Sequence, residues 1–572
     1  MKKFFRRWVW QRGEGPRLAL AAGAGVLHTL AFPKFGIAGL AWVAPGLLLA
    51  SALGAPGRTA FRCGCVGGLV FWLSSLYWLL NIPMPMVVPG TGLLALSCFL
   101  SLYWGAWVWL CWQCFPGKGR RSAEHCPART TEDMALAERC SALRAAPALN
   151  QFLESSWAQR AGWALFCAAA WVGVEMIQAR LFTGFPWNLL GASQYKLLPL
   201  IQIASVCGVY GLSFLVAWFS VGVWCGVAVV LVRPHRSRLW MGEVVLPLLA
   251  AVGVAFWGMR VVGTPVTGKS IKLALVQPSI PQTVIWDADA GPKRFAEVMA
   301  LSEVALTNHP DVLVWPEAAM PGYLRWDTNL FNGRTLMESV AELARRGKVW
   351  MVIGADDAAP AAGGEANFFN NAFLINPAGE IAGSYHKQRL VIFGEYVPLG
   401  SVVPWLRTFS GVTGDFTAGT QAVAFGMPSL GAKTSVLICF EDIFPHGARA
   451  HVEPDTDFLL NITNDGWFGD GAQQWQHAAN AALRAVENGR PLVRCANNGL
   501  TCWIDAHGRM LEVYFPGDEN IHRAGVKIAE VPLAGAAGET TFYWRNGDWF
   551  GWSCVAVAGM LLGLSLVRRR EG

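Results

Sequence analysis

Long apolar runs, separated by short polar stretches, occupy the first half and the last part of this sequence. An α-helix needs about 20 apolar residues to cross a bilayer. Runs near this length lie at about 17–32, 36–54, 62–80, 90–113, 161–179, 200–232, 239–259 and 549–567. The composition agrees, since 53% of the residues are hydrophobic, only 15% are charged and the mean hydropathy is +0.34. The sequence therefore predicts a membrane-embedded α-helical bundle of about eight transmembrane helices.

Basic residues predict the orientation of this bundle, because Lys and Arg collect in the cytoplasmic loops of membrane proteins. They gather in the first 17 residues, at 58–62, at 117–121, at 233–238 and at 568–570, always after an even number of spans. Both termini are therefore expected in the cytoplasm, and the long region between spans seven and eight outside it. A cleaved signal peptide is the alternative for the N-terminus, but no small-residue cleavage site is visible. The net charge of +7 forms no single patch, so no nucleic-acid partner is expected.

Three parts follow from this pattern. Residues 1–262 are expected to form a membrane domain of seven transmembrane helices, with a cytoplasmic insert near 116–160. Residues 263–546 have the composition of a soluble domain, and 547–572 hold the last helix and a basic tail. Strands are expected in IKLALVQPSI, DVLVWPE, VWMVIGADD, NNAFLINPAGEIAGSYHK, TSVLICFE, DFLLNITND and LTCWIDAHGRMLEVY, and helices in RFAEVMALSEVAL, LMESVAELARRG and QWQHAANAALRAVENGR. Strands outnumber helices without strict alternation, which favours a layered α/β sandwich with mixed sheets.

Three residues of this domain stand where a predicted strand ends, a common position for catalytic groups. Glu317 follows the strand in LVWPEAAMPGY, Lys387 follows a hairpin strand in SYHKQRL, and Cys439 ends the strand in LICFEDIF. Singly, each has an ordinary explanation as a solvated turn, a surface charge or a small core residue. Together they suit acyl transfer. A carboxylate can take the thiol proton, a thiolate can attack, and an ammonium can stabilise the resulting oxyanion.

The order of these motifs resembles a known family. WPE, then HK about seventy residues later, then a strand-ending Cys followed by Glu, resembles the Glu–Lys–Cys triad of the nitrilase, or carbon–nitrogen hydrolase, superfamily. FGEYVPLG, NITNDGWFGD, QQWQHAANAALRAVENGRPLVRCANNG and, among the apolar runs, TGFPWNLLGASQY are similar to the apolipoprotein N-acyltransferase family. The resemblance covers nearly the whole chain and implies a nitrilase-like α-β-β-α sandwich on a multi-span base.

The resemblance also implies roles for the three strand-end residues. Glu317 would be the general base, Lys387 the oxyanion stabiliser and Cys439 the acylated nucleophile. Glu395 of GEYVP would orient Lys387.

Further positions are expected beside the triad. Glu441 and Trp286 would line or gate the lipid site, and Phe440 stands where such enzymes often have tyrosine. His386 and His477 are expected to be structural. Trp467 and Phe468, on a Gly-flanked loop, suit either a core or a lid over acyl chains.

The resemblance implies an acyltransferase of the bacterial inner membrane, with its catalytic domain on the periplasmic face. It would move an acyl chain from a phospholipid, through a cysteine thioester, to the N-terminal amine of diacylglyceryl-cysteine in apolipoproteins, the last step of lipoprotein maturation. A monomer with no cofactor and no metal is expected. Two alternatives stay open: a membrane-tethered amidase that transfers acyl groups to water, and a lipid-binding or transport protein with a vestigial hydrolase domain.

Overall fold

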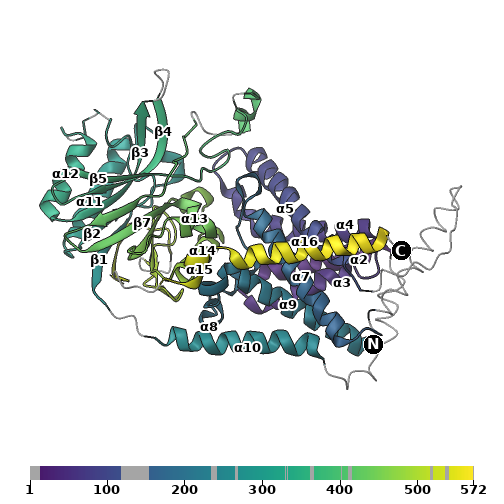
Figure 1. Cartoon of the computed structure of the whole chain (residues 1–572). Coiled ribbons are helices and arrows are strands. Elements are labelled where there is room, and N and C mark those ends of the chain that lie inside the picture. The colour runs from purple at the N-terminus through teal and green to yellow at the C-terminus, as the bar shows by residue number, and fades with distance from the viewer. Residues whose placement is uncertain are drawn as a thin grey trace. The chain divides into compact units, whose positions relative to one another are not determined.

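Two compact units make up the part of the chain that the computed structural model describes (Figure 1). The described residues are 13–116, 152, 154–232, 241–264, 268–285, 287–326, 328, 330–331, 333–360, 366–400, 402–409, 415–515, 520–534 and 540–570. The helical unit takes its described residues from Met1–Tyr77, Thr91–Val261 and Asp548–Gly572, and the α/β unit from Trp78–Gly90 and Val262–Gly547. Trp286, most of the 116–160 insert and the basic stretch 233–238 lie outside the described residues.

The helical unit follows the predicted apolar runs. Its helices are α2 (Glu14–Leu30), α3 (Ala44–Ser51), α4 (Gly57–Ser75), α5 (Val87–Gln113), α7 (Trp157–Gln178), α8 (Leu198–Ile201), α9 (Ala204–Val232), α10 (Gly242–Val262) and α16 (Trp549–Arg570). The long run at 200–232 is interrupted, since Gly208 has a non-helical conformation with φ of 65° inside α9.

The expected count of eight spans is not confirmed. Within the described residues, five helices are long and apolar enough to cross a membrane: Val87–Gln113, Trp157–Gln178, Ala204–Leu231, Gly242–Val262 and Trp549–Val567. Helix α3 has 8 residues and rises only about 12 Å, much less than the bilayer core. The five helices also differ in surroundings. The apolar window of α7 is 83% buried by protein, whereas those of α10 and α16 are 11% buried and present apolar side chains outward, as lipid-facing helices do.

Two six-stranded mixed sheets form the centre of the α/β unit. The first has the order β12-β1-β2-β3-β4-β5, and the second β11-β10-β9-β8-β7-β6. The bounds of the first sheet are β1 (Ser270–Gln277), β2 (Val312–Trp315), β3 (Trp350–Pro360), β4 (Ala366–Ile375), β5 (Ile381–His386) and β12 (Gly525–Pro532). Those of the second are β6 (Ala424–Met427), β7 (Ala432–Ile438), β8 (Phe458–Thr463), β9 (Leu492–Ala496), β10 (Cys502–Ile504) and β11 (Met510–Leu511). Strands β1, β2 and β3 run parallel, as do β7, β8 and β9.

The sheets pack face to face between two helical layers, which confirms the predicted α-β-β-α sandwich. Alternate side chains of a strand point to opposite faces. In β2, Val312 and Val314 therefore enter the core between the sheets, while Leu313 and Trp315 pack under the outer helices. Helices α11 (Gly291–Leu306) and α12 (Leu336–Gly347) cover the first sheet. Helices α13 (Pro445–Ala450) and α14 (Gln473–Asn488) cover the second.

The segment Trp78–Gly90, which joins α4 to α5 in sequence, belongs to the α/β unit. Trp78 is buried and donates through Nε1 to Oε1 of Gln476 on α14 at 3.1 Å. Its ring meets that of Phe468 edge to face, with centroids 4.6 Å apart. Asn81 donates to the carbonyl oxygen of Phe468 at 2.9 Å. This segment therefore holds the short helix η9 (Asp465–Phe468) in place.

Candidate active site

Glu317 and Lys387, which are 70 residues apart in sequence, form an ion pair in the α/β unit. Glu317 lies just beyond β2, and Lys387 directly follows β5 on the same sheet. The Lys387 Nζ atom donates to Glu317 Oε1 at 3.1 Å, and the other oxygen of Glu317 accepts the Asn464 backbone N–H at 2.9 Å. Both side chains are buried, with 1% of Lys387 and 7% of Glu317 exposed. A buried pair of this kind keeps its charges because each compensates the other.

Glu395 completes the pair as a second carboxylate on the same ammonium. Lys387 Nζ donates to Glu395 Oε1 at 2.9 Å, while Glu395 Oε2 accepts the backbone N–H of Val391 at 2.7 Å. Burial alone would lower the pKa of Lys387, but the Glu317 and Glu395 carboxylates raise it well above its ordinary value. Lys387 therefore stays protonated at neutral pH. The position of Glu395, bonded to the Lys387 ammonium, is consistent with the expected role of orienting Lys387.

Asn370 is a site residue that the sequence reasoning missed. Its Nδ2 atom donates to Oε1 of Glu317 and to Oε1 of Glu395, at 2.7 Å in each case. Asn370 pairs with Asp356 across β3 and β4, on the sheet face that also carries Lys387. The motif FFNNAFL contains one indication of this role, because two polar residues inside a buried hairpin strand need specific hydrogen-bond partners.

Cys439 begins the short helix η8 (Cys439–Ile443) directly after strand β7. Its φ of 56° places it in the left-handed region, where a residue with a Cβ is strained, and such strain gathers at functional turns. Its carbonyl oxygen accepts a hydrogen bond from Asn461 Nδ2 at 2.7 Å, which fixes the turn. Burial raises the pKa of the Cys439 thiol well above its ordinary value. The Glu317 carboxylate raises it further, and the Lys387 ammonium lowers it. The thiol therefore needs a base before it can attack.

Glu441 lies two residues after the cysteine and is buried, with 3% of its surface exposed. Its Oε1 accepts the backbone N–H groups of Gln388 and Arg389, at 2.7 and 3.0 Å. Its Oε2 accepts the N–H of Ile438 at 2.8 Å, and the Tyr385 hydroxyl lies 2.9 Å from both oxygens. Glu441 therefore joins the nucleophile turn to the segment after Lys387. These contacts of Glu441 are to protein groups, and its expected place in the lining of a lipid site stays a prediction.

Phe440 has an aromatic ring but lacks the hydroxyl that a tyrosine would carry. The Lys387 Nζ atom lies 5.6 Å from the centre of its ring, within the range of a cation–π contact. Phe440 also meets Phe444 edge to face, with centroids 5.5 Å apart. The other residue expected to line a lipid site, Trp286, lies outside the described residues.

The two histidines expected to be structural are both hydrogen-bonded to carboxylates. His386 stacks on Phe369 at 3.9 Å and lies 3.3 Å from Asp357, on the sheet face away from Lys387. His477 is fully buried between Asp442 and Asp465. His477 therefore lies among charged groups rather than in an apolar core.

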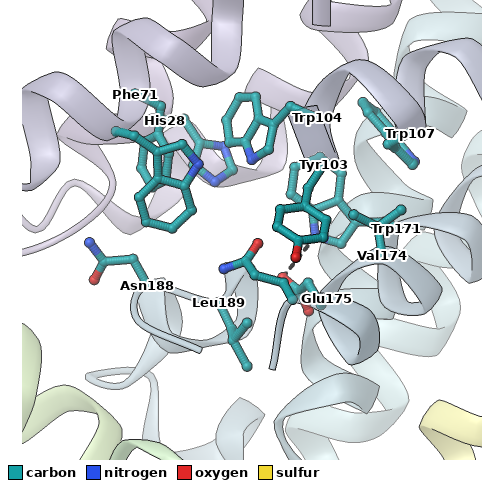
Figure 2. Close-up of a pocket in the computed structure, with 12 residues that line it drawn as sticks. His28, Phe71, Tyr103, Trp104, Trp107, Trp171, Val174, Glu175, Asn188 and Leu189 are labelled. Carbon is teal, nitrogen blue, oxygen red and sulfur yellow. Dashed lines mark hydrogen bonds between the residues drawn. The ribbon is translucent and has the colours of Figure 1, made fainter. Parts of the chain in front are cut away.

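A small, partly open hollow of about 20 Å³ lies in the helical unit (Figure 2). Aromatic side chains from α4, α5 and α7 surround it, among them Trp72, Trp104 and Trp171. Glu175 stands at its edge, where Oε1 accepts Trp171 Nε1–H at 2.8 Å and the Leu190 N–H at 2.7 Å. Glu175 thereby fixes the loop that carries the motif TGFPWNLLGASQY. The triad residues belong to the α/β unit, and none of them lines this hollow.

The arrangement in the α/β unit provides each group that a covalent acyl transfer needs. A carboxylate with an exposed fraction of 7% can accept a proton, and a fixed ammonium can stabilise an oxyanion. The strained turn presents a thiol at the end of a rigid strand. A protonated thiol beside a carboxylate is typical of an enzyme that forms a thioester after deprotonation.

Comparisons with known proteins match both halves of the chain. A family model described as carbon-nitrogen hydrolase matches residues 272–537. A second, described as the apolipoprotein N-acyltransferase N-terminal domain, matches residues 24–128 and 134–222.

Curated relatives extend the match over the full length. The chain is 34% identical to an apolipoprotein N-acyltransferase of Geobacter metallireducens, over 96% of this chain and 95% of that protein. It is 31% identical to one of Azotobacter vinelandii, over 99% of this chain and 97% of that protein. Among solved structures, a variant of the Nesterenkonia AN1 amidase from the nitrilase superfamily has a TM-score of 0.34 and 18% identity, covering 49% of this chain and 95% of the amidase.

Proposed function

The chain belongs to the apolipoprotein N-acyltransferase family, and from this premise we propose that it moves an acyl chain from a phospholipid to the N-terminal amine of a diacylglyceryl-cysteine in an apolipoprotein. The observation that carries the assignment to residues is the bonding of Lys387 to Glu317 and Glu395, beside the turn that presents Cys439. We assign Cys439 as the nucleophile, Glu317 as the general base and Lys387 as the oxyanion stabiliser.

In the first half-reaction, Glu317 takes the proton from the Cys439 thiol. The thiolate attacks the carbonyl carbon of a phospholipid acyl ester, and a tetrahedral oxyanion forms. Lys387 and backbone N–H groups near Phe440 stabilise this oxyanion. The C–O bond to the glycerol then breaks, Glu317 returns the proton to the leaving oxygen, and a lysophospholipid departs from the thioester.

In the second half-reaction, the amine of the diacylglyceryl-cysteine attacks the thioester carbonyl. Glu317 accepts a proton from the attacking nitrogen, the C–S bond breaks, and the proton passes to the Cys439 sulfur. The product is an amide, and the free thiol is restored. Both substrates carry acyl chains that reside in a bilayer, so a membrane-spanning base restricts their approach to the catalytic domain.

The proposed setting is the bacterial inner membrane, with residues 263–546 on the periplasmic face, both termini in the cytoplasm, and a monomer as the active form. The gathering of basic residues in the connections that follow an even number of apolar runs supports this orientation. The apolar surfaces of α10 and α16 support membrane embedding, because only 11% of each apolar window is buried by protein.

Intact-mass analysis of the full-length protein purified from membranes tests the proposal. We expect a fraction carrying one extra acyl chain, mapped by peptide to Cys439, and its loss in Cys439→Ala. Purified acyl-enzyme should then transfer the chain to a diacylglyceryl-cysteine peptide faster than to water. An acyl adduct on folded Cys439→Ala protein would contradict the mechanism, and transfer to water alone would favour an amidase.

Cys502→Ala provides a matched control. Cys502 is a fully buried thiol in the same unit, on strand β10 of the sheet whose strand β7 leads into Cys439. Because it packs among apolar residues away from the triad, its loss should leave the adduct unchanged.

A further inference from the structure

A buried ionic cluster lies beneath the nucleophile turn. His477 of α14 has no exposed surface, and both of its ring nitrogens face carboxylates. Nε2 lies 2.6 Å from Asp442 Oδ1, and Nδ1 lies 3.1 Å from Asp465 Oδ1. Nδ1 also lies 3.2 Å from Nη2 of Arg494, from which a neutral ring could accept, but only a ring protonated at both nitrogens donates to both carboxylates.

Arg494 of β9 is the second cation of this cluster. It donates to Asp442 Oδ2 at 2.8 Å and to Asp465 Oδ2 at 3.3 Å, so it binds the same two carboxylates as His477. All four side chains are buried, with at most 1% of any side chain exposed. Two buried carboxylates and one guanidinium would leave a net negative charge. A protonated His477 balances the cluster.

The two carboxylates belong to the two segments that carry the catalytic geometry. Asp442 is three residues after Cys439 in the short helix η8. Asp465 follows Asn464, whose backbone N–H donates to Glu317 Oε2 at 2.9 Å. The cluster thus joins the turn of the proposed nucleophile to the loop that holds the proposed base.

A second series of hydrogen bonds connects the cluster to Cys439, the proposed nucleophile. Arg494 also donates to Asn461 Oδ1 at 3.1 Å, and Asn461 Nδ2 donates to the Cys439 carbonyl oxygen at 2.7 Å. The charge of the cluster also changes the pKa of the Cys439 thiol, because the Asp465 carboxylate is among the groups that raise this pKa, after burial and Glu317.

We propose that His477 is a positioning residue that acts as a buried imidazolium, fixing Asp442 and Asp465 and offsetting their charge beside Cys439. The inference rests on the proposed role of Cys439 as nucleophile. It adds a residue that touches no substrate but sets the geometry and the electrostatics of the residues that do.

The charged groups that face His477 are Asp442 from η8, Asp465 from η9 and Arg494 from β9. Burial lowers the pKa of His477 and Arg494 lowers it too, while Asp442 and Asp465 raise it, and the pKa stands above its ordinary value. The pKa of Asp465 stands below its ordinary value although burial raises it, because His477 and Arg494 are close. Both directions agree with an ion cluster that stays charged at neutral pH.

Alkylation of Cys439 by iodoacetamide tests the proposal, because it reports the thiolate whether or not the chain transfers acyl groups. Full-length protein in detergent is alkylated across a pH series, and the Cys439 peptide is quantified by mass. In His477→Gln the cluster loses one positive charge, so the midpoint of alkylation should rise by about one pH unit. The double variant His477→Gln/Asp442→Asn restores the balance and should return the midpoint toward that of the wild type.

Asp442→Asn alone is the second variant, since it removes a negative charge and should lower the midpoint. His522→Gln is the matched control, because His522 contacts Asn498 and Asp470 outside the cluster. A thermal melt establishes which variants are folded. An unchanged midpoint in folded His477→Gln, or a double variant shifted as far as the single one, would overturn the proposal. If Cys439 acyl adducts are absent while these shifts occur, the proposed function fails, whereas the electrostatic coupling of His477 to the Cys439 thiol stands.

Discussion

The side-chain amide of Asn370 donates to the carboxylate of Glu317 at 2.7 Å, and the same nitrogen donates to Glu395 at 2.7 Å. Two carboxylates that both bind Lys387 repel each other, and a shared neutral donor between them reduces this cost. Asn370 therefore holds the proposed base in position without changing its charge.

Replacing Asn370 with Ala should slow acyl-adduct formation at Cys439 by about 10- to 100-fold, because hydrogen bonds to charged groups contribute about 1.5–3 kcal/mol each. The rate is measured by mass after mixing delipidated enzyme with phospholipid in detergent. Asn371→Ala is the control, since Asn371 points to the opposite sheet face and accepts from Ser384. Equal rates for wild type and folded Asn370→Ala would remove Asn370 from the site.

Glu317→Gln should separate the charge of Glu317 from its role as a base. The Glu317 carboxylate is, after burial, the largest cause that raises the pKa of Cys439. Its neutralisation should therefore lower the thiol pKa, so that maleimide labels Cys439 at lower pH than in the wild type. Acyl transfer from phospholipid should nevertheless fall by at least about 100-fold, because general-base catalysis contributes about 10²–10⁴-fold. Labelling and adduct formation that change in the same direction would contradict this division of roles.

Glu317, Lys387 and Cys439 could be proposed as a triad from the sequence because each follows or ends a recognisable strand and the motif order is specific. Asn370, Asn461 and Asn464 could not, since they act through contacts between segments far apart in the chain. Asn464 contributes a backbone N–H, a group that every non-proline residue carries. His477 shows the same limit, because a histidine on a helix reveals no charge state until its neighbours are known.

The fold, too, could be predicted only in part from the sequence. Strands such as β2 and β7 were visible as apolar runs, whereas β12 pairs with β1 only after about 250 residues of intervening chain. The predicted number of transmembrane helices is larger than the number found among the described residues. The difference arises because the apolar runs near 17–32, 36–54 and 62–80 form shorter or more polar helices. Hydropathy alone does not distinguish a buried helix of a bundle from a complete span.

Asp356 should make stability depend on pH. Burial, followed by the Glu395 and Glu317 carboxylates, raises its pKa from 3.8 to about 7. A carboxyl group whose pKa is raised by folding stabilises the folded state at pH values below its ordinary pKa. This stabilisation is lost as the pH rises through about 7. The melting temperature of the wild type should therefore fall, relative to Asp356→Asn, between about pH 4 and 7. Parallel melting curves from pH 4 to 8 would show that Asp356 ionises normally.

Glu441 should be needed for stability as well as for the geometry of the site. Its removal leaves the buried Ile438 N–H, the buried Tyr385 hydroxyl and two part-buried backbone N–H groups, those of Gln388 and Arg389, without their acceptor. Each buried donor that loses its acceptor costs about 1–3 kcal/mol, so the loss of two in Glu441→Ala should lower the free energy of unfolding by about 2–6 kcal/mol. Tyr385→Phe removes one donor and leaves the carboxylate otherwise bonded, so it should cost only about 1–2 kcal/mol. Denaturant titration in detergent measures both, and a larger loss for Tyr385→Phe would reverse the assignment.

The contact of Trp78 with Phe468 should matter for catalysis, although Trp78 touches no triad residue. Trp78 and Asn81 hold the short helix η9, and the residue before η9 is Asn464, which donates to Glu317. Trp78→Ala should therefore increase hydrogen exchange in residues 464–469 and slow adduct formation by about tenfold, the loss expected when one backbone donor is misplaced. Tyr77→Ala is the matched control, since Tyr77 is the adjacent aromatic residue and 38% of its surface is exposed. Faster exchange without any loss of rate would show that the Asn464 donor does not depend on this contact.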